Sequence, residues 1–356
     1  MSLGDSTVGW DVGGAHVKAA LVERGTVRDV MQVPCTLWQG IDAIDAALAC
    51  VYARWPQARA ASHAVTMTGE MTDLFADREA GVIALVEHLA ASFDGRARFF
   101  TEAGWLEAGE AQREWRRVAS ANWRASAAWV ARVRDDALLI DIGSTTTDVV
   151  PIRRGTVAAI GRDDATRLET GELVYQGVVR TPLCALAQRV RFRGRNCNVM
   201  NEWFATSADV YRLTDELDPA YDQHDTADHR GKDRAATCGR LARMIGRDAR
   251  DAGAADWLDL ARAFRDAQVR LIEASVTQVL AASTLPVDAP VIAAGCGDFI
   301  VHEIADRLVR PSIDFDRLLD ASGVAGRWGR VCAPSAAVAL LLGEATAHDV
   351  GLACGS

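Results

Sequence analysis

The amino-acid sequence predicts an α/β protein with two lobes of similar plan. Three observations point to this fold class. An apolar run that ends in an acidic, glycine-containing corner occurs twice, at residues 8–22 and at residues 138–150. Segments with strand-like and helix-like spacing of apolar residues alternate along the chain. Finally, 356 residues with 49% hydrophobic content are enough for two domains that each have a core.

The two corners follow one design, in which an Asp is followed two and three residues later by small residues. These are Asp11, Gly13 and Gly14 in VGWDVGGAHVKAALV, and Asp141, Gly143 and Ser144 in LLIDIGSTTTDVV. The two corners lie about 130 residues apart, whereas the units of a solenoid run to roughly 20 to 50 residues. The repeat therefore predicts two lobes of common plan, with a ligand between them.

We expect the first lobe to cover residues 1–134. Its predicted elements are three strands within 7–30, a helix over 40–55, a strand over 64–67, a helix over 79–93, a strand over 97–101 and a helix over 118–133. The turns between the first strands make this a β-meander start.

We expect the second lobe to cover residues 135–333. Its predicted elements are the strand of the second corner, a hairpin turning at Arg154-Gly155, a helical insertion over about 196–250, a helix over 257–283, and a strand, Gly-rich turn and helix over 290–308. The polar segment 222–234 interrupts the insertion as an exposed loop. A last helix, 334–347, is apolar all round, which predicts burial, with packing back onto the first lobe.

Composition excludes several classes of protein. A net charge of −9 and a pI near 5.3 argue against a nucleic-acid partner, because phosphate backbones are bound by excess Lys and Arg. The basic stretch 189–195 is the local exception, and we favour a solvated loop or strand edge over a site for an anionic substrate. The eight Cys include no C-x-x-C pair, which argues against zinc and redox dithiols.

No targeting segment or membrane span is evident in the sequence. We therefore expect a cytoplasmic protein with small-molecule substrates and no membrane partner, and a homodimer is left open as an alternative to a monomer.

Both corners have the composition of a phosphate site. Backbone N–H groups can approach a phosphate closely where side chains are small, and Ser144, Thr145, Thr146 and Thr147 add hydroxyl donors. The carboxylates of Asp11 and Asp141 can hold Mg²⁺ against phosphoryl oxygens, and without a metal they would repel the ligand. Lys18 adds a mobile cation to the first corner.

A third segment, AAGCGD at residues 293–298, has the composition of a turn that lets a ligand lie against the backbone before a helix N-terminus. Taken alone, each of the three segments is also explained as a tight turn with local hydrogen bonds. All three in this order favour a phosphate-binding protein. Gly295 and Gly297 are the predicted ligand-facing residues of the third segment.

These motifs resemble the two phosphate motifs and the adenosine motif of the actin, sugar kinase and Hsp70 superfamily. The resemblance implies two ribonuclease-H-like lobes around a central cleft. Within the superfamily the chain is most similar to hydantoinase A/oxoprolinase-related proteins linked to tetrahydromethanopterin-dependent C1 transfer. The narrower match rests on MTGEMTDLF (67–75), SANW (120–123), TGELVYQGVVRTPL (170–183), EWFATSADVYRL (202–213) and TADHRGK (226–232).

This subfamily includes the synthase of the furan-methyl aryl ether of methanofuran. The resemblance therefore implies a Mg²⁺-dependent transferase. An aminomethylfuran-methyl diphosphate would lose diphosphate, and the phenol oxygen of tyramine or γ-glutamyltyramine would take its place. Two alternatives are an ATP-dependent kinase or hydantoinase-like hydrolase, and a non-catalytic nucleotide or cofactor sensor. Ala15 and His16 replace hydroxyls that a kinase-like first corner carries, so ATP is a doubtful ligand.

The predicted site residues follow from the motifs and the resemblance. Those expected to bind the diphosphate or nucleotide are Asp11, Gly13, Gly14, Lys18, Gly143, Ser144, Thr145, Thr146, Asp148, Gly295 and Gly297, with Asp11 and Asp141 as metal ligands. The predicted catalytic carboxylates are Asp141, Asp209, Glu172 and Glu70, and the predicted substrate contacts are Asn122, Arg180 and Tyr211. A helix-cap role for Asp209 and a turn role for Glu172 are the plainer alternatives.

His224 and His229 lie among several Asp residues, but their five-residue spacing favours a polar substrate-side loop over a metal site. The repeat also predicts that Asp11 and Asp141 face each other across the cleft. With Mg²⁺, its waters and a diphosphate between them, their carboxylate oxygens should lie within about 15 Å, with the turn 295–297 on the wall.

Overall fold

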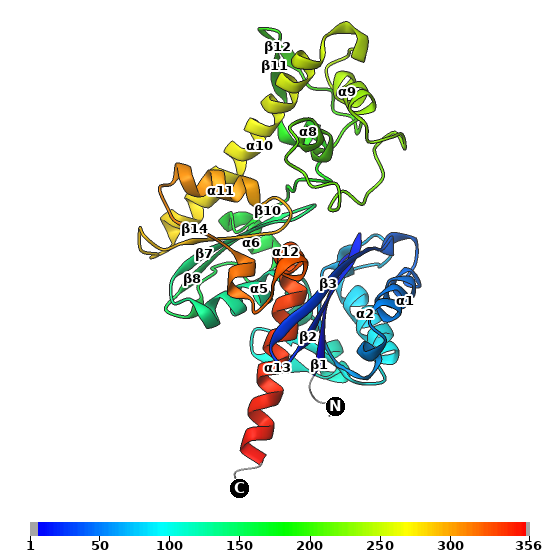
Figure 1. Ribbon diagram of the computed structural model, residues 1–356, viewed down its shortest axis with the longest axis vertical. Coiled ribbons are helices and arrows are strands. Elements are labelled where there is room, and N and C mark those ends of the chain that lie inside the picture. The colour runs from blue at the N-terminus through cyan, green and yellow to red at the C-terminus, as the bar shows by residue number, and fades with distance from the viewer. Residues whose placement is uncertain (1–5, 354–356) are drawn as a thin grey trace. The chain divides into compact units, whose positions relative to one another are not determined.

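The computed structural model describes the backbone of residues 6–353 and the side chains of residues 6–347 (Figure 1). The chain divides into two compact units. Unit 1 comprises the chain up to Asp136, the segment Ile152–Val157 and the chain from Asp314 onward. Unit 2 comprises Ala137–Pro151 and Ala158–Ile313.

The sheet of unit 1 has the strand order β3-β2-β1-β4-β5-β6. Its strands are β1 (Ser6–Val12), β2 (His16–Glu23), β3 (Thr26–Pro34), β4 (Ser62–Met67), β5 (Ala97–Thr101) and β6 (Gly104–Leu106). The first three strands pair antiparallel as a meander, and β4 and β5 are added in parallel. As a result, β1 lies at the centre of the sheet.

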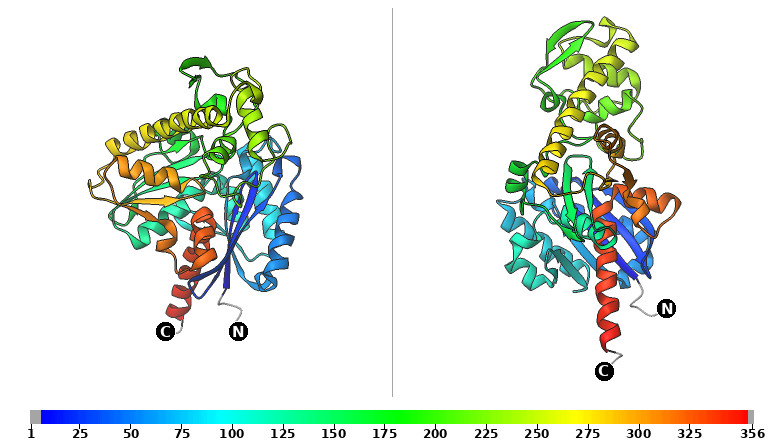
Figure 2. Two further views of the ribbon diagram at one scale, coloured as in Figure 1. Left: turned by 45° about the horizontal axis from the view of Figure 1, so that its top comes forward. Right: turned by 90° about the vertical axis from the view of Figure 1, so that its left-hand side faces the viewer.

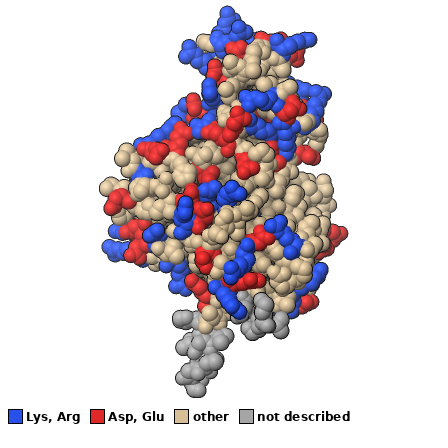
Figure 3. Space-filling model, in the orientation of Figure 1, with Lys and Arg blue, Asp and Glu red and all other residues tan. Residues whose placement is uncertain are grey.

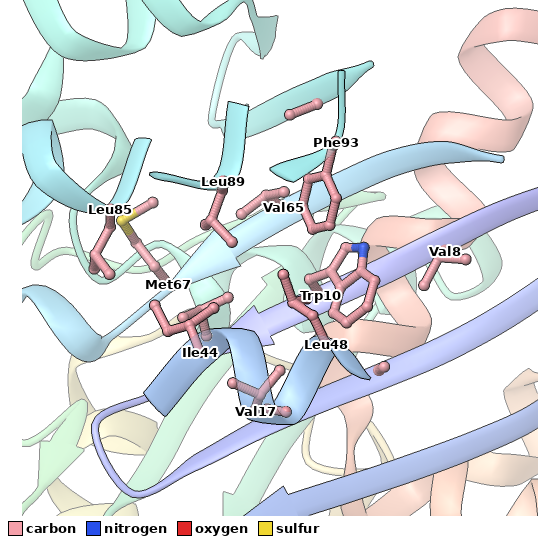
Figure 4. Close-up of a cluster of buried hydrophobic side chains, with 14 of the residues drawn as sticks. Val8, Trp10, Val17, Ile44, Leu48, Val65, Met67, Leu85, Leu89 and Phe93 are labelled. Carbon is pink, nitrogen blue, oxygen red and sulfur yellow. The ribbon is translucent and has the colours of Figure 1, made fainter. Parts of the chain in front are cut away.

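Helices cover both faces of this sheet. They are α1 (Ala43–Arg54), α2 (Arg78–Ser92), α3 (Ala108–Arg113), α4 (Trp115–Val118), α5 (Asn122–Val133), α12 (Gly323–Val331) and α13 (Ala333–Ala353). Figure 4 shows Trp10 of β1 among Leu48 of α1, Leu89 of α2 and Phe93, in the core between the sheet and these two helices. The apolar α13 packs against β1, β2, β4 and α5, which accounts for its burial from Ala333 to Ala339.

The predicted C-terminal boundary of the second lobe, residue 333, is wrong. Residues 314–333, placed there from the sequence, belong to unit 1. The Val27 N–H donates to the Asp320 carbonyl at 2.9 Å, and the Trp129 indole donates to the Leu318 carbonyl at 3.0 Å. The tip of the predicted hairpin, Ile152–Val157, also joins unit 1, because the Gly155 N–H donates to the Asp135 carbonyl at 2.9 Å.

The sheet of unit 2 has the strand order β10-β8-β7-β13-β14, with β9 paired to β8. Its strands are β7 (Ala137–Ile142), β8 (Thr147–Arg153), β10 (Leu173–Val174), β13 (Val291–Ala294) and β14 (Ser312–Asp314), and the paired β9 (Thr156–Val157), the end of β8 and Asp314 are counted with unit 1. The helices of this unit are α6 (Asp164–Thr170), α7 (Leu183–Leu186), α8 (Ser207–Leu213), α9 (Arg234–Arg243), α10 (Ala254–Ala282) and α11 (Asp298–Arg307). Figure 2 shows α10, in yellow, running from the sheet to the helical insertion.

The basic stretch forms the hairpin β11 (Arg189–Phe192) and β12 (Arg195–Asn198). Val190 and Phe192 are buried, and Phe192 stacks on Trp257 with ring centroids 5.0 Å apart. The arginines of the stretch are exposed, and Figure 3 shows Lys and Arg side chains gathered over this part of the insertion. The alternation of Arg with apolar residues is thus that of a half-buried strand.

No single helix in the described part of the chain is long and apolar enough to cross a membrane. One bent pair, Gly323–Val331 with Ala333–Ala347, meets the criteria of length and composition only, and it turns by 105°.

A buried histidine lies in the core of unit 1. His63 of β4 is fully buried, accepts a hydrogen bond from the Trp10 indole at 3.0 Å and stacks on Phe93 at 4.0 Å. Burial, with a smaller contribution from Arg96, lowers the pKa of His63 from 6.5 to about 3. The imidazole is therefore neutral in the folded protein at all ordinary pH values.

This histidine makes stability depend on pH. Because the folded-state pKa lies below the unfolded value, only the unfolded chain takes up the proton as pH falls from about 6.5. We expect His63 to lower the free energy of unfolding by about 2 kcal/mol between pH 7 and pH 5. Gln at this position can still accept from Trp10 but does not titrate. Urea unfolding at both pH values should thus show a smaller loss in His63→Gln, and an equal loss would contradict this account.

Candidate functional site

The first corner lies at the end of β1, the central strand of unit 1. Asp11 is 4% exposed and pairs in register with Lys18 of β2, whose Nζ lies 3.5 Å from the Asp11 carboxylate. The Gly13 N–H donates to the His16 carbonyl at 2.9 Å and closes the turn. The acidic group, the glycines and the lysine predicted from the sequence therefore occupy one corner.

Two short turns pack on this corner. In η1 (Leu37–Gln39), the Leu37 N–H donates to the Gly14 carbonyl at 3.1 Å. Before η3 (Gly69–Met71), the Thr68 N–H donates to the Val12 carbonyl at 2.9 Å. A Cβ atom at Gly69 would lie only 2.7 Å from Leu37 Cδ2, so the two turns touch each other as well as the corner.

Glu70 of η3 forms hydrogen bonds with other side chains of unit 1. Its side chain is fully buried, and its Oε1 accepts from the Ser120 hydroxyl at 2.6 Å and from Arg78 at 3.4 Å. Arg78 also donates to Ser120 at 2.9 Å. Ser120 has a φ of 48°, a left-handed value that is unusual for a serine. Asn122, the first residue of α5, lies partly exposed two residues further on.

The second corner lies at the end of β7 in unit 2. Asp141 is partly exposed, as are Ser144, Thr145 and Thr146. The Gly143 N–H donates to the Thr146 carbonyl at 2.9 Å and closes the turn. Thr147 is buried instead, and its hydroxyl donates to the Gln176 carbonyl at 2.8 Å.

The segment 176–181 is bonded to this corner along its length. Val178 N–H donates to the Gly143 carbonyl at 3.1 Å, and the Val179 and Arg180 N–H groups donate to the Ser144 carbonyl at 3.1 and 2.8 Å. A Cβ atom at Gly177 would lie 2.5 Å from backbone atoms of residues 143–145. Arg180 thus joins the corner through its backbone, while its side chain is exposed.

The Gly-rich turn completes the second corner. β13 pairs in parallel with β7, with Ala294 opposite Asp141, and the Gly297 N–H donates to the Ile142 carbonyl at 2.9 Å. Gly295 has a φ of 83°, and a Cβ there would lie 2.5 Å from Asp141 Oδ1. The turn leads into the N-terminus of α11, which favours a negatively charged ligand. Unit 2 therefore brings together Asp141, the hydroxyls and the turn.

Two predicted residues of the second unit have structural partners. Asp148 accepts from the buried Arg167 at 2.9 Å. Glu172 accepts from the backbone N–H groups of Ile160 and Gly161 at 2.6 and 2.7 Å, and from the Thr170 hydroxyl at 3.0 Å. These contacts account for both carboxylates without a ligand, so we assign Asp148 and Glu172 to the framework of the unit.

Asp209 likewise belongs to a buried network. At position N3 of α8 it accepts from the Thr206 N–H at 3.1 Å, from Arg212 at 2.7 Å and from Arg240 at 2.8 Å. Arg212 continues to Asp222, and Arg240 to Asp228, so the network holds the polar loop against the helices. The cap role, the plainer of the two interpretations, accounts for these contacts.

Tyr211 is fully buried, and its hydroxyl donates to Gln268 at 2.8 Å. Burial raises the pKa of Tyr211 well above its usual value, so the phenol stays protonated. Gln268 in turn donates to the Gly177 carbonyl at 2.9 Å. Tyr211 therefore supports the second corner from behind and is not exposed to a substrate.

The Asp209 network makes a prediction about stability. Asp209→Asn removes the negative charge that the fully buried Arg240 shares with the partly exposed Arg212, and breaking such a buried pair costs about 3 kcal/mol or more. We expect urea unfolding to show a loss of this size. The matched control is Asp215→Asn, whose ion pair with Arg234 is exposed and whose loss should stay below about 1 kcal/mol. Equal losses would contradict a structural role for Asp209.

The histidine-containing loop has the contacts of a polar surface loop. Asp222 bonds Arg212 and Lys232. Burial, Arg180 and Lys232 lower the pKa of His224 to about 4. Within the described chain, residues 222–234 contain no set of three His, Cys, Asp or Glu ligand atoms close enough to share an ion.

Sequence reasoning missed several exposed apolar side chains beside the corners. Trp38 in η1 is 43% exposed and Met71 in η3 is 47% exposed. Tyr175, which precedes the segment bonded to the second corner, is 58% exposed. A cavity of about 1200 Å³ also opens in unit 1, lined by Phe100, Trp105, Arg124, Arg132 and Glu344 among others. No predicted site residue lines this cavity.

The chain is similar in sequence to one protein family and to two named proteins. Residues 61–333 match the Hydantoinase/oxoprolinase family. A Methanocaldococcus jannaschii protein named (4-{4-[2-(gamma-L-glutamylamino)ethyl]phenoxymethyl}furan-2-yl)methanamine synthase is 27% identical over 94% of this chain and 97% of its own length. A Methanococcus vannielii protein of the same name is 28% identical over 58% of this chain and 90% of its own length.

Among solved structures, nucleotide-free acetone carboxylase superposes with a TM-score of 0.58 at 10% identity, over 93% of this chain and 70% of that one. This similarity concerns the fold alone. The expected α/β class with two main sheets is confirmed, and the chain shares the fold of this carboxylase.

Proposed function

The chain belongs to the hydantoinase/oxoprolinase family, and we propose that it is a transferase that joins a furan-methyl group to a phenol oxygen. The donor is an aminomethylfuran-methyl diphosphate, and the acceptor is tyramine or γ-glutamyltyramine. The products are an aryl ether and diphosphate. The ether is a precursor of a C1 carrier of the methanofuran type.

The similarity to the two synthases supports the class of reaction. The name of each relative describes a phenoxymethyl group on a furan ring, which is an ether between a ring CH₂ and a phenol oxygen. Forming this bond from an alcohol requires a good leaving group on the CH₂. A diphosphate supplies one, and its departure calls for a site that stabilises phosphate charge.

The composite second corner is the observation that carries the proposal. The hydroxyl-bearing residues Ser144, Thr145 and Thr146, the Gly-rich turn at Gly295 and the N-terminus of α11 lie at one corner with the partly exposed Asp141. Small residues and a helix N-terminus suit an anionic phosphate. In this proposal the nucleotide-type site of the fold holds the diphosphate of the donor.

The donor atoms at the corners suit Mg²⁺, which prefers carboxylate and hydroxyl oxygens. Asp141 and Asp11 would hold the ion, and when bound it neutralises charge on the leaving diphosphate. The facing of Asp11 and Asp141 stays a prediction, with carboxylate oxygens within about 15 Å of each other in the loaded enzyme.

The reaction balances without a further reagent. The bond between the furan-methyl carbon and the diphosphate oxygen breaks, and its electron pair leaves with diphosphate. A lone pair of the phenol oxygen forms the new bond to carbon, and the phenol proton passes to a base. Of the predicted acceptor-side carboxylates, we retain Glu70 as the candidate base, because its turn η3 follows the hydrogen bond from the Thr68 N–H to the Val12 carbonyl of the first corner.

The test is product formation by purified protein. With both substrates and Mg²⁺, mass spectrometry should show the ether, and diphosphate should appear in equal amount. Omitting the phenol or the metal should suppress both products. Intact substrates under full conditions would reject the proposal, and heat of ATP binding in a calorimeter together with such a result would favour a kinase or hydrolase instead.

A further inference from the structure

We infer that Arg180 is a phosphate-binding residue of the second corner and that its guanidinium pairs with the diphosphate of the donor. This inference rests on the proposed function, and it names a cation for a site that so far consists of a carboxylate, hydroxyls and a helix N-terminus. The sequence motifs predict Arg180 as an acceptor-side contact, so the inference changes its ligand. Arg180 and the residues that hold it all belong to unit 2.

The main chain of Arg180 is fixed against the corner. Its N–H donates to the Ser144 carbonyl at 2.8 Å, and the Val179 N–H donates to the same carbonyl at 3.1 Å. The Ala208 N–H of α8 donates to the Val179 carbonyl at 3.2 Å, so the chain just before Arg180 is held between the corner and α8. The Arg180 side chain therefore starts from a fixed place next to the hydroxyl-bearing Ser144.

The Arg180 side chain differs in exposure from its neighbours. Within the segment 176–181 it is the one exposed side chain, and the other five residues are buried. Val178, Val179 and Thr181 are each 4% exposed or less. The segment thus packs its apolar side chains into unit 2 and presents a single cation at the surface.

Tyr175 shows in which direction this side chain extends. Val174 of β10 pairs with Thr147 of β8, so the next residue along, Tyr175, lies level with Thr146 of the corner. Burial lowers the pKa of Arg180, and the Tyr175 hydroxyl opposes this shift, which requires the hydroxyl to lie near the guanidinium. Both the main chain and the guanidinium of Arg180 therefore lie on the side of the corner.

The surroundings of the guanidinium favour an anionic ligand. The Arg180 side chain is exposed by its surface area, yet the surrounding chain removes enough water to lower its pKa. Burial, Arg180 and Lys232 together lower the pKa of His224 to about 4, so this nearby imidazole is neutral at neutral pH. An arginine stays charged even so. Because less water screens it, this cation gains more from an anion than one on an open surface does.

The chemistry of the donor explains why a cation is needed at this corner. A diphosphate ester carries several negative charges, and Asp141 adds another at the same corner. A guanidinium can donate two parallel hydrogen bonds to two phosphate oxygens. As the bond between carbon and oxygen breaks, a further negative charge develops on the diphosphate. The contact with Arg180 should therefore be stronger in the transition state than in the bound substrate.

The binding experiment is calorimetry of the complete enzyme with inorganic diphosphate, with and without Mg²⁺. Arg180→Gln should weaken the binding of diphosphate about tenfold, the scale of losing hydrogen bonds to a charged group. Arg180→Lys keeps the charge but loses the paired donors, so its affinity should lie between those of Arg180→Gln and wild type. The matched control is Arg191→Gln, because Arg191 is an exposed arginine of β11 in the same unit, and it should bind like wild type. Equal binding by Arg180→Gln and wild type, or no binding by wild type, would overturn the inference.

Steady-state kinetics distinguish the diphosphate from the phenol as the ligand of Arg180. With Mg²⁺ and both substrates, Arg180→Gln should lower kcat/KM for the furan-methyl diphosphate about 30-fold. The KM for the phenol should stay unchanged, both for tyramine and for γ-glutamyltyramine. A raised KM for the phenol with unchanged kcat would assign Arg180 to the acceptor and overturn the inference, and so would a change seen only with the carboxylate-bearing γ-glutamyltyramine.

The two experiments together separate this inference from the proposed function. If Arg180→Gln weakens the binding of diphosphate but wild type forms no ether, the phosphate-binding role of Arg180 stands and the proposed reaction fails. If wild type forms the ether while Arg180→Gln binds diphosphate and turns over like wild type, the proposed reaction stands and the inference fails.

Discussion

Replacing Asp141 by Asn is expected to lower turnover by about 100-fold or more while leaving the fold intact. The substitution keeps the size of the side chain and removes one negative charge. Asp141 is partly exposed at the end of β7, next to three hydroxyl-bearing residues that are also partly exposed. Loss of one strong electrostatic contact with the transition state has an effect of this scale.

The measurement is the steady-state rate of ether formation as Mg²⁺ is varied, with thermal unfolding recorded on the same samples. Asp225→Asn is the matched control, because the Asp225 side chain is 88% exposed and lies in the polar loop of the same unit. It should retain wild-type turnover. Unchanged turnover in Asp141→Asn, or an equal loss in the control, would remove the second corner from the reaction.

Ala in place of Gly177 is expected to have the second largest effect. The added Cβ would lie 2.5 Å from the Gly143 carbonyl oxygen, the Ser144 carbonyl carbon and the Thr145 nitrogen, all of them backbone atoms. The corner or the segment 176–181 must therefore move. Overpacking of this kind costs about 1 to 3 kcal/mol in the free energy of unfolding, and a displaced corner should lower turnover about 100-fold.

Gly239 in α9 provides the matched control, since a Cβ there meets no atom within 4 Å. Gly239→Ala should leave turnover unchanged and raise the free energy of unfolding by up to about 1 kcal/mol. The measurements are urea unfolding and the rate of ether formation, made on both variants. If Gly177→Ala behaves like Gly239→Ala, the close packing of this segment on the corner does not matter for function.

The corners themselves were predictable from sequence because their signal is local. An Asp at the end of an apolar strand, followed by Gly and hydroxyl residues, specifies a tight polar turn within about ten residues. The turn at Gly295 was predictable for the same reason. Its contact with Asp141 follows from the parallel pairing of β13 with β7, which was not predicted from the sequence.

The acceptor-side residues were harder to predict because burial depends on distant partners. Asp209 bonds Arg240, 31 residues away, and Tyr211 bonds Gln268, 57 residues away. Nothing in the segment 202–213 shows that these partners exist. The motifs and the resemblance therefore suggested a substrate site where the folded chain has a structural network.

The predicted end of the second lobe at residue 333 was wrong for a related reason. Thr26 and Asp320 are 294 positions apart, yet their side chains share a hydrogen bond of 2.5 Å. The sequence around residues 314–333 carries no signal for the unit to which it returns. Trp38 was missed because a tryptophan in a short turn reads as core, and only its exposed fraction of 43% in the structure indicates otherwise.

Oxygen labelling tests the central claim most directly, namely that the phenol oxygen displaces diphosphate from the furan-methyl carbon. The enzyme is incubated with Mg²⁺, furan-methyl diphosphate and a phenol that carries ¹⁸O in its hydroxyl group. The account predicts an ether that retains the ¹⁸O and unlabelled diphosphate in equal amount. Label in the released phosphate, or an unlabelled furan-methyl alcohol in place of the ether, would contradict it.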